Sequence, residues 1–216
     1  MSATRSPRRT AQATLAPPSA HDAKAAIGYR VRTGTATAVL LGGPTTSPRV
    51  LTRLQVPLCD ADDPDVRQPY HVVTEQDEAR GMMLVRQTMK AATDLATRAT
   101  EQLMKRAEQE RRRVRAADLV VGSDVDPASL RSLHVRAHAL EGRLYRDAVE
   151  AALSACGLTC NVFVEREVVA QAAALIGKDP SELKGTLNAL GRAVGRPWGA
   201  QEKMATIAAW VGLVPE

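Results

Sequence analysis

The chain has 216 residues, of which 44% are apolar but only 3% aromatic, and it carries a formal net charge of +5. This composition suffices for one large domain or two small ones, with a core built from Ala, Val, Leu and Ile. No apolar run approaches the roughly 20 residues that a membrane-spanning helix needs, so we expect no such helix. The excess of positive charge favours an anionic partner.

The beginning of the chain differs in composition from the rest. Residues 1–22 are rich in Ser, Thr, Ala and Pro, and four basic residues against one acidic residue fall within the first 24. We therefore expect a disordered basic tail over residues 1–23 and a single domain over residues 24–216. The three cysteines, Cys59, Cys156 and Cys160, match no common metal-binding spacing. A reducing cytoplasm is the expected location.

The first part of the expected domain has the pattern of β-strands. Residues 25–41 are rich in β-branched and small residues, and residues 49–58 alternate between apolar and polar. Glycine and proline at residues 42–44 predict a turn between the two stretches, which makes a β-hairpin. A polar loop is expected next, and then a short third strand at residues 70–73.

Helical and strand patterns alternate in the remainder of the chain. We expect a helix at residues 75–115, a buried strand at 118–121, a helix at 126–156, a strand at 161–164, and helices at 166–176, 180–194 and 201–213. Two of these helices have a clear start, because Asp126-Pro127 and Asp179-Pro180 each place a capping aspartate before a proline in the first helical turn.

This order of elements predicts an α/β domain in which a β-meander is followed by β-α units, forming a mixed sheet with helices on both faces. It resembles the ribonuclease H-like superfamily and, within it, the RuvC-type Holliday-junction resolvases. The resemblance covers most of residues 25–213. It rests on the element order, on the buried strand Leu119-Val120-Val121 leading into Asp124, and on the final helix. It implies a ribonuclease H-like fold and a nucleic acid partner.

The resemblance also implies a nuclease site in which three or four carboxylates hold two divalent metals. The chain departs from this pattern. The first carboxylate of the family lies on the first strand, but residues 24–59 contain no Asp or Glu, and the matching stretch reads Ile27-Gly28-Tyr29-Arg30-Val31. Asp124 and Asp126 stand at the second position, and Glu202 alone on the final helix. We therefore expect a degenerate relative without the standard nuclease site, or a different chemistry on the same fold.

The predicted helix at residues 126–156 carries the most specific local pattern. His134, His138, Glu141 and Tyr145 fall within roughly 60° of one another on one helical face. Two imidazoles one turn apart, together with a carboxylate, can bind a metal or supply a general base. A solvated face with pairing between successive turns is the alternative. The candidate catalytic residues are Asp124, His134, His138 and Glu141, and the candidate ligands of one divalent metal are Asp124 and His134.

The arginine-rich segment Arg111, Arg112, Arg113 and Arg115 is the candidate for contacts with nucleic acid phosphates. The alternative is that these charges only stabilise the C-terminus of a helix. Three functions remain open: a nucleic-acid-associated domain, a small enzyme with an Asp/His/Glu acid-base or one-metal site, and a non-catalytic interaction module. A homo-oligomer is compatible with each.

Overall fold

The computed structural model describes residues 24–60 and 62–215, and the tail expected at residues 1–23 lies outside them. The sheet has five strands in the order β3-β2-β1-β4-β5. They are β1 (Lys24–Arg32), β2 (Thr35–Gly42), β3 (Arg49–Pro57), β4 (Arg113–Val121) and β5 (Val162–Val164). The first three form an antiparallel meander, and β4 and β5 run parallel to β1. The predicted mixed sheet is confirmed.

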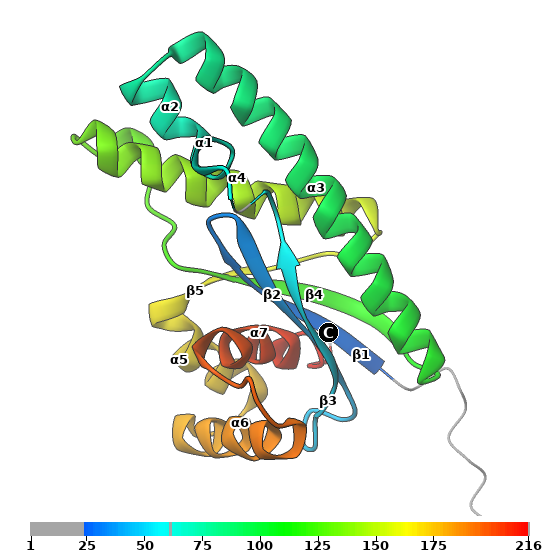
Figure 1. Cartoon of the computed structure of the whole chain (residues 1–216). Helices are drawn as coiled ribbons and strands as arrows, with labels where there is room; N and C mark the ends of the chain where they lie inside the picture. Colours follow the sequence, from blue (N-terminus) through cyan, green and yellow to red (C-terminus); the bar gives the residue numbers. More distant parts are fainter. Residues whose placement is uncertain (1–23, 61, 216) are drawn as a thin grey trace, which may run out of the picture.

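Helices cover both faces of this sheet (Figure 1). One face carries α3 (Glu78–Gln109) and α4 (Leu133–Ala155), and the other carries α5 (Glu165–Ile176), α6 (Pro180–Val194) and α7 (Ala200–Val211). Successive residues of β1 serve the two cores in turn, since Ile27 packs on the α3 side and Ala26 on the α7 side. Because both faces are buried, β1 and β2 are almost continuously apolar. Among the described residues, no helix combines the length and the apolarity that crossing a membrane requires.

The predicted strand at residues 70–73 is wrong. These residues belong to α2 (Pro69–Glu75), which follows the short helix α1 (Pro64–Arg67). Pro69 stands in the first turn of α2, and α2 contacts both α3 and α4 while burying Val72. Tertiary packing therefore overrides the strand preference of the Tyr and Val residues in this segment. The third strand of the meander comes instead from residues 25–41, which divide into β1 and β2 at a turn where Gly34 has a φ of +77°.

Two helix boundaries also differ from those predicted. The helix expected at residues 75–115 ends at Gln109, and Arg111 follows with a φ of 55°, a left-handed conformation that stops the helix. Arg113 and Arg115 therefore lie on β4 and not at a helix end. Asp126 caps only a 3-10 turn, η1 (Pro127–Ser129), whereas α4 begins at Leu133 with Ser132 as its cap.

The backbone of α7 lies directly against β1 at Gly28. A Cβ atom at this position would be 1.9 Å from the carbonyl oxygen of Ala205 and 2.3 Å from the backbone nitrogen of Ala209. Only glycine permits such a close approach of helix and strand. This contact fixes the final helix across the centre of the sheet.

Candidate functional site

Three histidine side chains meet where α2 lies beside α4. His71 comes from α2, and His134 and His138 come from successive turns of α4. One ring nitrogen from each histidine lies within 4.8 Å of the other two. The Nε2 atoms of His134 and His138 are 3.2 Å apart, and the ring centroids are 4.4–4.9 Å apart. We call this group the histidine cluster.

Two carboxylates hold the other side of these rings. Glu141 is fully buried, and its Oε1 lies 2.7 Å from Nδ1 of His71 and accepts the backbone N–H of the same residue at 3.3 Å. The Oε2 of Glu141 is 3.6 Å from Nδ1 of His138. Glu75, at the end of α2, places Oε1 at 3.1 Å from Nδ1 of His134. Each histidine thus has Nδ1 beside a carboxylate, which leaves Nε2 as the nitrogen available for another partner.

The pKa values of these two carboxylates are shifted in opposite directions. Burial raises the pKa of Glu141, and the hydrogen bond from His71 only partly offsets this effect. The pKa of the exposed Glu75 is lowered, chiefly by its hydrogen bond with His134. Among the described residues, Glu141 forms ion pairs only with histidines, so any positive charge that compensates it directly must reside at the histidine cluster.

The hydroxyl of Tyr145 explains how α1 and α2 are held against α4. Tyr145 is fully buried one turn beyond Glu141, and its hydroxyl donates to the carbonyl oxygen of Arg67 at 3.0 Å. Burial raises the pKa of Tyr145 well above its usual range, which keeps this donor protonated. The hydrogen bond anchors the chain just before α2 and so helps to place His71 over Glu141.

The structure brings together three of the four predicted catalytic residues, His134, His138 and Glu141, but Glu141 is buried and not part of a solvated face. Asp124 does not belong to the histidine cluster. Its carboxylate instead forms an ion pair at 2.5 Å with Arg146 of α4. His71 was not among the predicted site residues, because residues 70–73 were expected to form a strand and His71 lies 70 residues from Glu141 in the sequence.

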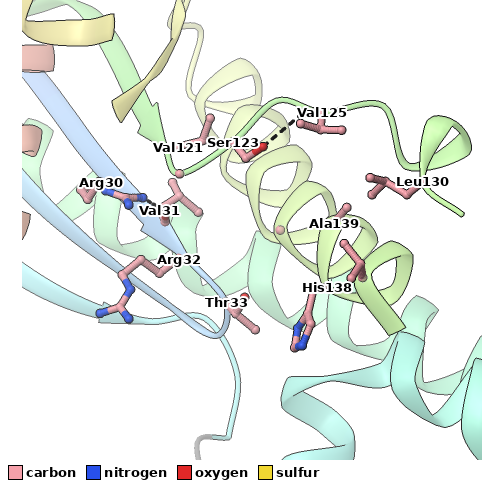
Figure 2. Close-up of a pocket in the computed structure, with 13 residues that line it drawn as sticks. Arg30, Val31, Arg32, Thr33, Val121, Ser123, Val125, Leu130, His138 and Ala139 are labelled. Atoms are coloured by element: carbon pink, nitrogen blue, oxygen red, sulfur yellow. Dashed lines mark hydrogen bonds between the residues drawn. The ribbon is translucent and has the colours of Figure 1, made fainter. Parts of the chain in front are cut away.

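A cleft of about 440 Å³ opens beside the histidine cluster, at the ends of β1 and β4 (Figure 2). Figure 2 shows Arg30 and Arg32 on the strand side of this cleft and His138 on the α4 side. Because β1 and β4 are parallel, the cleft lies at the carboxyl ends of parallel strands, where open α/β sheets bind their ligands. His138 belongs to both the cleft and the histidine cluster.

Arg30 lies on β1, within the stretch Ile27-Gly28-Tyr29-Arg30-Val31, where the family resemblance implies the first metal-binding carboxylate but the chain has no acidic residue. Arg30 is only 6% exposed, and its guanidinium forms an ion pair with Glu165 at the start of α5 and donates to the carbonyl oxygen of Val31. Glu202, on α7, accepts the backbone N–H of Gly199 and so caps its own helix. Within residues 24–60 and 62–215, no group of three or more carboxylates is close enough to share a metal ion.

The arginine-rich segment lies at the opposite end of the sheet from the cleft. Arg111, Arg113 and Arg115 are exposed, whereas Arg112 is half-buried and donates to the carbonyl oxygen of Lys24 at 3.3 Å. The start of β4 pairs with the start of β1, and the cleft lies where both strands end. Eight residues of extended strand separate the two places by about 26 Å.

The comparisons with known proteins bear on the fold. No protein-family model matches the sequence, and no curated protein sequence matches it. Thermus thermophilus RuvC, in a structure of its complex with a Holliday junction substrate, aligns with a TM-score of 0.52 and 11% identity over 87% of this chain and 91% of that chain. A second structure of Thermus thermophilus RuvC gives a TM-score of 0.51 and 11% identity over 87% and 92%. The chain has the ribonuclease H-like fold. Fold alone does not specify an activity, so function must be argued from the residues at the sites.

Proposed function

We propose that this chain is a nucleic-acid-associated domain of the ribonuclease H-like fold that does not use the standard two-metal nuclease site. The observation that carries this proposal is Arg30, a buried cation on the first strand, where the resemblance implies a carboxylate and the chain has none. The fold likeness to a resolvase solved with a Holliday junction supports nucleic acid as the partner.

Arg30 disfavours a two-metal site for two physical reasons. A guanidinium at the end of β1 repels divalent cations, and it also engages Glu165, the carboxylate that follows β5. Converting Glu165 into a metal ligand would leave Arg30 buried and uncompensated, which costs about 3–5 kcal/mol for a broken buried ion pair. A pair of metal ions about 4 Å apart would therefore lack its first carboxylate ligand, and the positive charge of Arg30 would repel both ions.

Exposed arginines supply the expected contacts with phosphates. Arg32 is exposed beside the cleft, and Arg113 and Arg115 are exposed on β4 at the far end of the sheet. Arginine binds phosphate oxygens through paired hydrogen bonds, and such contacts carry affinity without reading sequence. The described residues that line the cleft include no Phe, Tyr or Trp, so base stacking is not expected there.

The test is binding of the full-length chain to a labelled four-way junction, a duplex and a single strand. Binding is measured by fluorescence anisotropy over a range of salt concentrations. We expect binding to weaken with salt, such that the logarithm of the binding constant falls linearly with the logarithm of the salt concentration. Substituting Arg113 and Arg115 by alanine should weaken binding to all three, whereas Arg192→Ala, on the distant helix α6, serves as the matched control. A second variant in which Arg5, Arg8 and Arg9 become alanine separates the contribution of the first residues.

The same nucleic acids, incubated with the protein and Mg²⁺ or Mn²⁺, test whether the chain lacks the standard two-metal nuclease activity. No cleavage above a metal-free control is expected. Mg²⁺-dependent cleavage that is lost on Glu165→Gln would contradict the assignment of Arg30. Absence of binding at low salt would contradict the association with nucleic acid.

A further inference from the structure

We propose that His71, His134 and His138 bind one Zn²⁺ ion through their Nε2 atoms, with water as the fourth ligand. This goes beyond the association with nucleic acid, and it uses residues of α2 and α4, whereas the resemblance implies carboxylates on the first strand, after the fourth strand and on the final helix. Three imidazole nitrogens with one open position form a ligand set that zinc accepts in tetrahedral catalytic sites. Imidazole is a ligand that suits zinc better than it suits magnesium or calcium.

The distances between the ring nitrogens fit this ion. With Zn–N bonds of about 2.0–2.1 Å, two ligands of a tetrahedral ion lie about 3.3 Å apart. The Nε2 atoms of His134 and His138 are already 3.2 Å apart. One ring nitrogen of His71 lies within 4.8 Å of a ring nitrogen of each of the other two histidines, so bringing three such nitrogens to ligand spacing requires a shift of at most about 1.5 Å. Changes of side-chain torsion supply such a shift without moving a helix.

The carboxylates set the tautomers that zinc requires. Glu141 and Glu75 lie beside the Nδ1 atoms of His71 and His134 at 2.7 Å and 3.1 Å. A carboxylate that accepts the proton on Nδ1 leaves a lone pair on Nε2 and makes that nitrogen a stronger ligand. The Nε2 of His71 is buried and has no hydrogen-bond partner among the described residues. A cation shared with His134 and His138 satisfies this atom.

The charges also favour a cation at this place. Glu141 is fully buried, and no Lys or Arg of the described chain forms an ion pair with it. An isolated buried carboxylate is strongly disfavoured. Two positive charges on Zn²⁺ balance Glu141 and Glu75 together, and they account for the placement of two carboxylates around three rings.

The fourth ligand position is accessible to solvent. The side chains of His134 and His138 are 61% and 49% exposed, and His138 also lines the strand-end cleft. Zinc lowers the pKa of a bound water molecule to about 7. A zinc-bound hydroxide would therefore be present at neutral pH beside a cleft that contains Arg32.

Zinc binding is tested on the full-length chain without a histidine tag, which is stripped of metal with a chelator and then incubated with excess Zn²⁺. The amount of zinc retained after dialysis, the affinity in competition titrations and the zinc X-ray absorption spectrum are measured. We expect one zinc per chain, with a shell of three imidazoles and one oxygen and Zn–N distances of about 2.0–2.1 Å. Retention of no zinc, or a shell containing sulfur, overturns the proposal.

The variants His134→Ala and His138→Ala identify the ligands, because both side chains are exposed and their removal should leave the fold intact, as checked by circular dichroism. Each substitution should lower the zinc affinity more than about 100-fold. The reason is that losing a ligand should cost more than losing a carboxylate that orients a ligand, which costs up to about 100-fold. His21→Ala removes the remaining histidine of the chain and should change nothing. An affinity that survives His138→Ala, or that falls equally with His21→Ala, refutes the site.

Discussion

Glu141→Gln separates a metal-orienting role of this residue from a purely structural one. The substitution keeps the size of the side chain and an oxygen that can accept from Nδ1 of His71, which lies at 2.7 Å. It removes the negative charge that favours the lone pair on Nε2. Because the amide oxygen can replace the carboxylate oxygen in the hydrogen bond with His71, the zinc-free protein should lose at most about 1 kcal/mol of unfolding free energy.

The effect on zinc binding should be much larger. Losing a carboxylate that orients a metal-bound histidine costs about 10- to 100-fold in affinity. At a free zinc concentration of about 100 times the wild-type Kd, zinc stabilises the wild-type protein by about 2.7 kcal/mol and the variant by about 0.4–1.4 kcal/mol. For a chain of this size, 1 kcal/mol corresponds to a shift in Tm of about 2–4 °C, so zinc should raise the wild-type Tm by about 5–11 °C and that of the variant by about 1–6 °C.

The assay is thermal unfolding followed by circular dichroism with and without zinc, together with a zinc titration of each protein. Glu150→Gln, on the same helix but paired with Arg146, is the matched control and should respond to zinc like the wild type. Two results would refute the reasoning. One is an unchanged zinc affinity in Glu141→Gln. The other is a loss of more than about 3 kcal/mol without zinc, which would make Glu141 and His71 a structural ion pair.

Three other predictions concern the fold, a buried acid and the basic surface. Gly28→Ala should destabilise the protein by at least about 3 kcal/mol in urea unfolding, because the new methyl group would lie 1.9 Å from the carbonyl oxygen of Ala205; a loss below about 1 kcal/mol would mean that α7 is not held so tightly. Burial raises the folded-state pKa of Asp118, so this residue contributes stability at low pH that is lost as the pH rises above its ordinary value of 3.8. The unfolding free energy of Asp118→Asn relative to wild type should therefore increase from pH 3 to pH 7, and a constant difference would contradict this cause. Arg113→Ala should reduce the salt slope of nucleic acid binding by about 1, and an unchanged slope would remove this residue from the contact surface.

Local sequence patterns predicted much of the fold. The strand character of residues 25–41 and the cap before α6 were recognisable, although the division of the first stretch into β1 and β2 was not. The strand at residues 70–73 was wrong, because the packing of α2 on α3 and α4 outweighs the preference of its residues for strands. The boundary after α3 was also wrong, since the Arg-rich segment has no residue that excludes a helix.

The sequence by itself determined two features of the site. The absence of acidic residues from 24 to 59 is the reason for proposing that the chain lacks the standard nuclease site, and helical periodicity alone places His134, His138 and Glu141 on one face. Only the tertiary structure decided which distant side chains join them. Glu165 meets Arg30 across 135 residues of chain, and His71 meets Glu141 across 70. Periodicity is a property of a single element, whereas such contacts depend on how elements far apart in the chain pack together, which no local pattern encodes.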